Sequence, residues 1–233
     1  MRRLARITGT LMIVIGVGAL AWALTVWQWQ DPFTAVLNEL EQRQLAHDFD
    51  RRVEEGRGGI LVDTSAVQLR RSLPRAAAAW RTSSKRGDAV ARLRIPALGV
   101  GEVVVNGTDH DSLKRGPGRY LGSAMPCEGK LVYIAGHRTT YGAPFSHIDR
   151  IAKGDRIFLE LPYATFEYSV TGSRVVAASQ TSVLKSKGFE QLVLQACHPR
   201  FFASQRYLVY AKPVRVTPHG SDRATPYRAL GSS

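Results

Sequence analysis

Cys197 and Arg206 could do chemistry together, because Cys197 ends a strand-like segment and Arg206 lies on the segment that returns from it. Cys197 ends the apolar stretch 192–196, and Arg206 follows nine positions later. A cysteine attacks as its thiolate, and a reference pKa of about 8.5 leaves a free thiol only partly ionised at neutral pH. Acyl transfer also needs donors for the negative oxygen that develops on the attacked carbonyl. The pair therefore predicts a nucleophile, Cys197, beside an anion stabiliser, Arg206, whose guanidinium carries several donors.

His137 is the candidate base for this thiol. Histidine gives and takes a proton near neutral pH, and His137 follows the apolar stretch 131–135. His198 is adjacent to Cys197, but neighbours along an extended chain point to opposite faces, so it is poorly placed. A surface histidine without a catalytic role is the alternative for His137.

The elements that must position these residues are short strands. Apolar or alternating stretches recur with turn signals between them, at 90–95, 100–105, 131–135, 156–161, 166–170, 174–178, 192–196 and 207–216. Short helices are expected near 111–114 and 145–151. Eight short strands and little strong helix predict a mainly β fold, a closed or nearly closed barrel, which also removes exposed strand edges.

The N-terminal segment predicts a membrane anchor. Residues 7–27 hold no charged side chain, which covers the roughly 20 residues needed to span a bilayer core. Arg2, Arg3 and Arg6 precede this stretch and Asp31 follows it, a pattern that places the N-terminus inside and the rest outside. We expect a cytoplasmic tail at 1–6, a transmembrane helix at 7–27 and a single-pass protein of the cell membrane.

Two further observations bear on this anchor. Tryptophans stand where an interfacial aromatic belt is expected, at Trp22, Trp27 and Trp29. A cleaved signal peptide is the alternative, because Ala19-Leu20-Ala21 fits a small-residue cleavage pattern. Cleavage there would follow an unusually long apolar run.

Residues 28–88 are predicted to form an extracytoplasmic helical stalk and linker. Apolar positions between 31 and 53 recur at spacings near three and four, which indicates a helix with one apolar face. This helix dimerises, lies on the folded domain or is a solvated spacer, and the pattern leaves these alternatives open. The stretch 60–88 is interpreted as linker because it contains Pro74 and has weak periodicity. The folded domain is expected at 89–217, followed by a disordered tail at 218–233.

The charge balance limits the partners. A net charge of +13 favours an anionic surface such as phospholipid headgroups or an anionic polymer. No dense basic run with interleaved aromatic residues appears, so nucleic acid is not an expected partner. No motif has convincing metal-ligand spacing, so neither a metal nor a cofactor is expected.

The chain has two cysteines, Cys127 and Cys197. Outside the cytoplasm the default for an even count is a disulfide. Composition alone therefore favours a bridge, in which Cys197 is structural and not catalytic.

Three separated motifs carry a family resemblance. They are GHRTTYGAPF at 136–145, ACHPR at 196–200, and Gln205-Arg206. In this order they resemble the sortases, and most closely their class E branch. The resemblance covers about 89–216, together with the layout of an anchor followed by a stalk.

The resemblance implies a membrane-anchored cysteine transpeptidase with an eight-stranded sortase barrel. Cys197 is then the nucleophile, His137 the general acid and base, and Arg206 the stabiliser of the substrate carbonyl and oxyanion. Such enzymes cut a C-terminal sorting signal between Thr and Gly, and hold the Thr carbonyl as a thioester until an amine releases it. The implied partners are surface proteins with the signal, a lipid-linked peptidoglycan precursor and the membrane. For class E the signal is typically Leu-Ala-X-Thr-Gly, where many relatives read Pro at the second position.

The sequence departs from the family pattern at several positions. Ala196 stands where many sortases carry Thr, and Leu121 follows Tyr120 where Pro is common. Tyr120 is a candidate for the pocket that reads the second residue of the signal, with a core tyrosine as the alternative. In this family Cys127 would lie near the active site, so a disulfide with Cys197 is conceivable and would silence the enzyme. A thiol hydrolase that uses water as acceptor, and a non-enzymatic wall-binding protein with a structural disulfide, remain alternatives.

Overall fold

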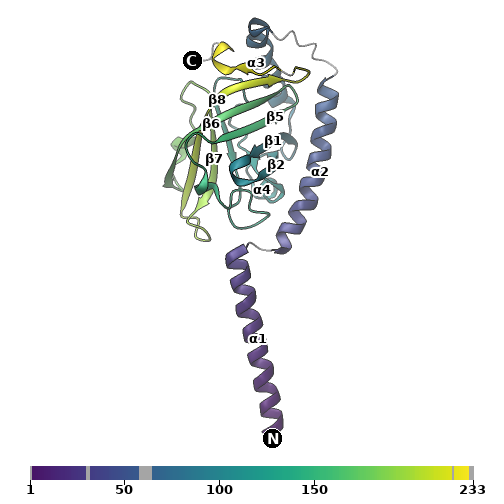
Figure 1. Cartoon of the computed structure of the whole chain (residues 1–233), viewed down its shortest axis with the longest axis vertical. Coiled ribbons are helices and arrows are strands. Elements are labelled where there is room, and N and C mark those ends of the chain that lie inside the picture. Colours follow the sequence, from purple (N-terminus) through teal and green to yellow (C-terminus); the bar gives the residue numbers. More distant parts are fainter. Residues whose placement is uncertain (1, 30–31, 58–64, 222, 231–233) are drawn as a thin grey trace.

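The computed structural model describes residues 2–29, 32–57, 65–221 and 223–230. Figure 1 shows one long N-terminal helix, α1 (Arg2–Trp29), leading to a β-barrel with a second helix, α2 (Pro32–Arg57), along one flank. The shorter helix α3 (Ala66–Ser83) covers one end of the barrel. The barrel carries the site residues, and the helices lie around it.

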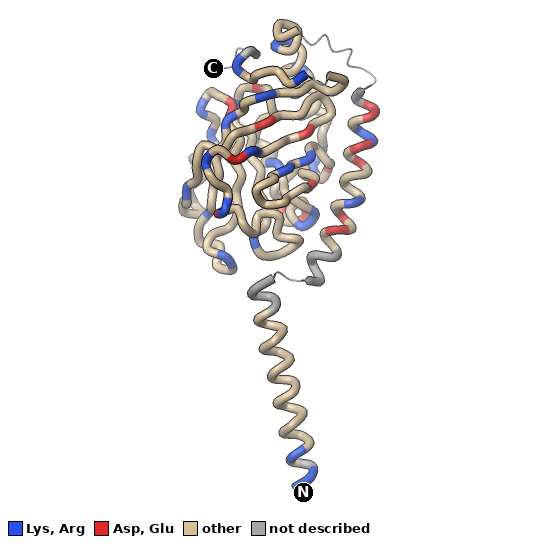
Figure 2. The backbone as a smooth tube through the Cα atoms, viewed as in Figure 1, with Lys and Arg blue, Asp and Glu red and all other residues tan. Residues whose placement is uncertain are grey.

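Helix α1 meets the length and composition needed to cross a bilayer. Its segment 5–24 has a mean hydropathy of 2.1, and none of it is buried against the rest of the chain. Figure 2 shows basic residues at the N-terminal end of α1 and an uncharged length beyond them. The side chains of Trp27 and Trp29 lie outside the described residues, so the expected aromatic belt is described only at Trp22, which is 47% exposed.

The strands close into the predicted barrel. Their order is β6-β5-β1-β2-β3-β4-β7-β8, and a β6–β8 pairing completes the ring. The bounds are β1 Ala89–Ile95, β2 Val100–Asn106, β3 Gly118–Arg119, β4 Leu131–Ala135, β5 Arg156–Leu161, β6 Ala164–Ala177, β7 Gln191–His198 and β8 Gln205–Pro218, with β9 Thr225–Pro226 added on β8. The short helices are η1 Pro96–Leu98, α4 His110–Arg115, η2 Ile148–Arg150, η3 Thr181–Leu184 and η4 Tyr227–Leu230.

The eight-stranded barrel is confirmed, although two strand assignments were wrong. The stretches 166–170 and 174–178 belong to one continuous strand, β6, which passes through Gly172 with a register shift. A bulge at glycine bends a strand without ending it. In the sequence, the glycine of such a bulge has the same appearance as the glycine of a turn. The eighth strand is instead β3, whose two residues are too short to give a periodic pattern. The helix expected near 145–151 is only the short turn η2.

Each strand of the β4–β7–β8 wall has two buried faces. Leu192, Leu194 and Ala196 of β7 point into the barrel interior. Val193 points the other way and packs with Leu208 of β8 in a separate outer cluster. The period of two therefore defines an inner face and an outer face, and the outer face is the one that matters for the site.

Helix α2 lies on the barrel, which decides between the alternatives for the stalk. Leu45, Phe49 and Val53 are buried against Val103 and Val105 of β2. Their spacing of four puts them on one side of the helix. Burial of side chains of this size stabilises by about 1.5–3 kcal/mol each, so α2 is a fixed part of the fold.

Helix α3 corrects the linker assigned to 60–88. Ser65 caps it by accepting a hydrogen bond from the Gln68 amide, and Leu69, Leu73 and Ala77 pack into the barrel core. Three residues of this stripe are fully buried, partly buried Ala76 and Trp80 pack beside them, and Pro74 lies inside the helix. A proline removes a helical hydrogen bond, but burial of the stripe outweighs that cost.

The tail is ordered as far as residue 230, apart from residue 222 where it is not described. Tyr227 and Leu230 are buried in the barrel core, and the Tyr227 hydroxyl donates to Glu190 Oε2 at 2.6 Å. The expectation of a disordered tail at 218–233 is therefore wrong for this part. Two buried apolar residues outweigh an otherwise polar composition.

Candidate active site

Cys197 and Arg206 face each other across the β7–β8 ladder. They are direct partners in its antiparallel register, and opposed residues lie on the same face with Cβ atoms about 4.5–5.5 Å apart. Alternation along β7 places Cys197 on the outer face with Val193. Its side chain is partly exposed there. The structure thus brings the predicted nucleophile and guanidinium together on a face that a substrate can reach.

The Arg206 guanidinium is tied to the β7–β8 loop. Its Nη1 donates to the carbonyl oxygens of Ala203 at 2.7 Å and Gln205 at 2.8 Å. Its charge also acts on Tyr133: burial raises the pKa of Tyr133, and Arg206 opposes that rise. No ion pair involves Arg206 within the parts of the chain that the structure describes. The positive charge is therefore held on the outer face without a carboxylate to neutralise it.

His137 lies on the neighbouring strand end. Strand β4 runs parallel to β7, with Ala135 opposite Gln195, and the Gly136 amide continues the pairing by donating to the Gln195 carbonyl at 2.9 Å. His137 is the next residue, and Cys197 is two positions beyond Gln195. Adjacent strands are about 4.8 Å apart. The structure therefore places the candidate base on the strand end beside the candidate nucleophile.

The environment of His137 favours the neutral imidazole. Burial, with a smaller contribution from His110, lowers the pKa of His137 below its usual value of 6.5. The Tyr141 ring lies 5.1 Å from the His137 ring at 45°. His137 Nε2 is buried and has no hydrogen-bond partner among the described atoms. A neutral ring at pH 7 with a vacant nitrogen is suited to accept a proton.

Comparison with known proteins shows the family to which the chain belongs. The model of the Sortase domain matches residues 93–214. The chain belongs to the sortase family. It is 33% identical to Sortase D of Bacillus subtilis over 132 residues, which is 55% of this chain and 65% of that protein. It is 32% identical to Sortase SrtE1 of Streptomyces coelicolor over 157 residues, 60% of this chain and 45% of that protein.

Solved sortase structures show the same barrel. A Sortase D5 transpeptidase of Clostridium perfringens matches with a TM-score of 0.59 and 25% identity, over 75% of this chain and 98% of that one. Sortase E1 of Streptomyces coelicolor, solved with a tripeptide in the active site, matches with a TM-score of 0.56 and 29% identity, over 60% and 97%. Sortases of both the D and E types are similar to this chain, so the family is shown while the class is not.

Arg138 is a site residue of this sortase that the sequence did not single out. It is 5% exposed and pairs with Asp149 at 2.9 Å. Its Nη1 lies 2.8 Å from Nδ1 of His198 and donates to the Cys197 carbonyl at 3.4 Å. Because a guanidinium only donates, Nδ1 of His198 is the acceptor in this contact. Its position in the sequence could have indicated this, because Arg138 follows His137 and therefore turns toward the opposite face of the strand end, where His198 lies.

His198 is separated from the nucleophile, as expected from strand alternation. Its ring contacts Arg138 and lies 6.0 Å from the ring of Tyr207, while Cys197 faces the outer cluster. It therefore belongs to the network that fixes the strand end and is not a base for the thiol.

Cys127 lies at the other end of the wall. Its amide donates at 2.7 Å to Oε2 of Glu190, the residue that precedes β7. Cys197 is seven residues beyond Glu190 on this extended segment, so about 23 Å of strand separates Cys197 from the residue that holds Cys127. A disulfide needs Cα atoms within about 7 Å. Both cysteines are free thiols. The disulfide favoured by composition is therefore wrong, and the wall-binding alternative that depended on it loses its basis.

The surroundings of Cys127 also make it unreactive. Burial, reinforced by the Glu190 carboxylate, raises the pKa of Cys127 to about 12. A thiol that stays protonated at neutral pH is a poor nucleophile. Of the two cysteines, only Cys197 has the exposure and the neighbours that catalysis needs.

Tyr120 lies on the outer face, where it is partly buried. It packs against the outer cluster, and its ring is 6.3 Å from that of Tyr133 in an edge-on arrangement. Its amide donates to the Tyr133 carbonyl at 2.9 Å. The residue therefore shares a face with Cys197 and has a structural packing role on that face.

Proposed function

We propose that this chain is a membrane-anchored cysteine transpeptidase. It cleaves a C-terminal sorting signal between Thr and Gly and transfers the protein to an amine. The observation that carries the proposal is the placement of Cys197 opposite Arg206, with His137 on the adjoining strand end. Nucleophile, anion stabiliser and base then come from three elements that meet on one partly exposed face.

In the first half of the reaction, the Cys197 thiol loses its proton to His137 and its sulfur attacks the Thr carbonyl. Arg206 donates hydrogen bonds to the oxyanion of the tetrahedral intermediate. His137 then returns the proton to the departing Gly nitrogen. The C–N bond breaks, and the acyl half of the substrate remains as a thioester on Cys197.

In the second half, an incoming amine attacks the thioester carbonyl. His137 removes the proton of this amine, Arg206 again stabilises the oxyanion, and the Cys197 thiolate leaves and is reprotonated. The protein is now joined to the acceptor by an amide bond. One acid–base group serves both halves because each half is the reverse of the other in its proton transfers.

We further propose class E, on the strength of the motifs at 136–145 and 196–200, with Leu-Ala-X-Thr-Gly as the signal. Tyr120 is proposed to contact the side chain of the second signal residue, because it shares the outer face with Cys197. A bulky aromatic ring at that point would favour alanine over proline.

The proposed location is the cell membrane, with the catalytic domain at 89–217 outside. The substrates are proposed to be surface proteins with the signal and a lipid-linked peptidoglycan precursor. Asn38, six residues into α2 and about 9 Å along its axis, packs on the loop that carries His137. The active site is therefore at the end of the barrel where the chain arrives from α1, and confinement to one surface raises the effective concentration of both substrates.

Product analysis tests this proposal against hydrolysis. The full chain in detergent is incubated with a Leu-Ala-X-Thr-Gly peptide, with and without a glycine-based amine. We expect an amide-joined product that depends on the amine, and faster conversion than with the Leu-Pro-X-Thr-Gly peptide. Release of the free Thr acid at the same rate with and without amine, and without joined product, would establish a hydrolase instead.

A further inference from the structure

Helix α2 reaches the active site although it lies outside the matched family region, which begins at residue 93. Asn38 of α2 contacts the loop that follows His137 at Gly142. It is 5% exposed, and its Nδ2 donates to the Lys114 carbonyl at 3.0 Å. Asn38 is on the side of α2 that faces the barrel, and a polar side chain buried there is expected to have specific partners.

The contact between Asn38 and Gly142 is tight. A Cβ atom built on Gly142 would lie 2.4 Å from Asn38 Oδ1 and 3.0 Å from its Cγ. Gly142 also has a φ of +70°, which favours glycine. The backbone of the loop is therefore pressed directly against the Asn38 amide, with no room for a side chain between them.

Gln42, one helical turn further, fixes the other side of this contact. Its Nε2 donates to the carbonyls of Arg115 at 2.6 Å and Val103 at 3.1 Å, and its Oε1 accepts from the Val103 amide at 2.7 Å. Glu41 adds an ion pair with Arg115 at 3.0 Å. Together these contacts join α2 to the end of α4 and to β2, so the helix cannot shift without breaking several partly buried hydrogen bonds.

Helix α4 and the loop that follows His137 surround Tyr141, the neighbour of Gly142. His110, the first residue of α4, lies edge-on to the Tyr141 ring at 6.2 Å. On its other side the Tyr141 ring lies 5.1 Å from His137. Asn38 thus acts on Gly142, Gly142 sets the backbone of Tyr141, and Tyr141 packs on the imidazole.

We propose that Asn38 is a positioning residue of the active site, through which α2 holds the loop 137–145 and aligns His137 with Cys197. The expected effect on kcat rests on the proposed function, whereas the expected effect on the position of the His137 ring does not. The helix that links the barrel to the membrane anchor is then part of the catalytic unit and not a spacer. A misplacement of about 1 Å in a catalytic group costs on the order of 100-fold in rate, so the loss of this contact has a measurable effect.

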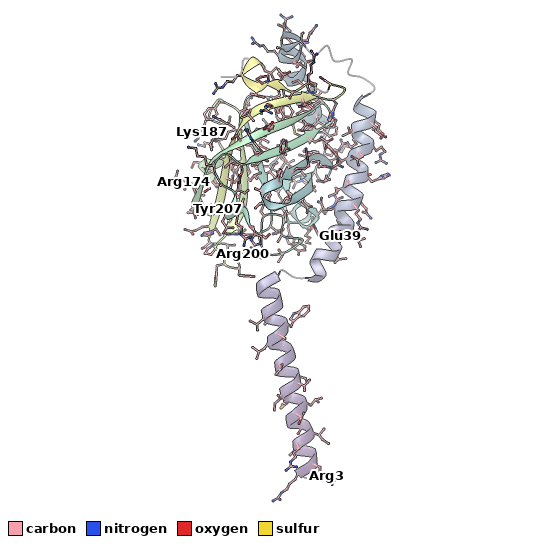
Figure 3. The ribbon with its side chains drawn as sticks, viewed as in Figure 1. Arg3, Glu39, Arg174, Lys187, Arg200 and Tyr207 are labelled. Atoms are coloured by element: carbon pink, nitrogen blue, oxygen red, sulfur yellow. The ribbon has the colours of Figure 1, made fainter. Side chains whose placement is uncertain are left out.

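The kinetic test compares Asn38→Ala with Glu39→Ala in the full chain. Glu39 is on the same helix and is exposed, and among the described residues it forms a solvent-facing ion pair with Arg43. Figure 3 labels it on α2. For Asn38→Ala we expect kcat to fall about 10- to 100-fold with KM changed less than twofold. Glu39→Ala should match the wild type. Equal kcat values for the two variants would overturn the proposal.

A double-mutant cycle tests the Asn38–Gly142 contact itself. Gly142→Ala inserts a Cβ against Asn38, so we expect a large loss of kcat on its own. In the Asn38→Ala background the conflicting atoms are removed, and the added loss from Gly142→Ala should be several-fold smaller. Multiplicative effects of the two changes would show that they act independently and would contradict the positioning role.

A third measurement separates this inference from the proposed activity. The NMR signals of the His137 ring should carry a ring-current shift from Tyr141, which Asn38→Ala reduces and Glu39→Ala retains. This holds even if no peptide is converted, in which case only the proposed function fails. An unchanged His137 signal in folded Asn38→Ala would overturn the positioning role, whatever the kinetics show.

Discussion

The Cys197→Ala variant is expected to lose peptide transfer to the background level, a fall of about 10⁴-fold or more. Alanine removes the sulfur that holds the acyl group, and neither water nor His137 can form the thioester in its place. The measurement is the rate of amide-joined product from a sorting peptide and an amine. The barrel should stay intact, because Cys197 is at the exposed end of β7 and contributes nothing to the core cluster.

Cys127→Ala is the matched control for this prediction. It also removes one thiol, but from a buried site beside Glu190 at the far end of the wall. We expect a loss of about 1 kcal/mol in the free energy of unfolding and a rate within twofold of the wild type. If Cys127→Ala lost transfer and Cys197→Ala kept it, the assignment of the nucleophile would be reversed.

Arg206→Lys is expected to lose about 100- to 1000-fold in kcat although the charge is kept. In the structure one nitrogen of the guanidinium is used to hold the β7–β8 loop through Ala203 and Gln205. The remaining donors are then available for an oxyanion beside Cys197. Lysine is a point charge without this fork, so it cannot hold the loop and meet the oxyanion at the same time.

Arg200→Lys provides the comparison for this effect. Arg200 lies on the same loop and donates to the Ser146 carbonyl at 2.5 Å, and Figure 3 places it at the same end of the barrel. It is not opposite Cys197, so we expect a change in kcat of less than about fivefold. The kinetic constants of both variants with the same peptide and amine make the test. Near-normal turnover in Arg206→Lys would remove Arg206 from the mechanism.

The sequence predicted which candidate site residues lie together better than it predicted the elements around them. Cys197 and Arg206 are joined by a short return, so local strand periodicity was enough to place them on one face. His137 depends on the parallel pairing of β4 with β7, which no local pattern reports. The family motifs supplied that link, and the register of Ala135 with Gln195 now gives its physical basis.

The elements missed in the sequence share one cause. Helix α3 buries only Leu69, Leu73 and Ala77 fully, and β3 has two residues. Their stability comes from burial against the barrel and not from their own propensity. The same holds for Asn38, which is an ordinary polar residue of a helix until the fold places it against Gly142.

The disulfide was misjudged for a different reason. The number of cysteines says nothing about where they lie in the fold, and two thiols outside the cytoplasm favour a disulfide by default. The structure places Cys127 and Cys197 at opposite ends of a strand pair, and Glu190 holds the Cys127 backbone there. Spatial separation therefore overrides the count.

Intact-mass analysis of the acyl-enzyme tests directly whether Cys197 forms the thioester. The full chain is incubated with a Leu-Ala-X-Thr-Gly peptide without an acceptor amine, quenched in acid and mapped by digestion. We expect a mass gain equal to the peptide up to its Thr, located on Cys197, removed by hydroxylamine and absent in Cys197→Ala. An adduct on Cys127, an adduct that persists in Cys197→Ala, or peptide cleavage without any adduct in wild type would contradict it.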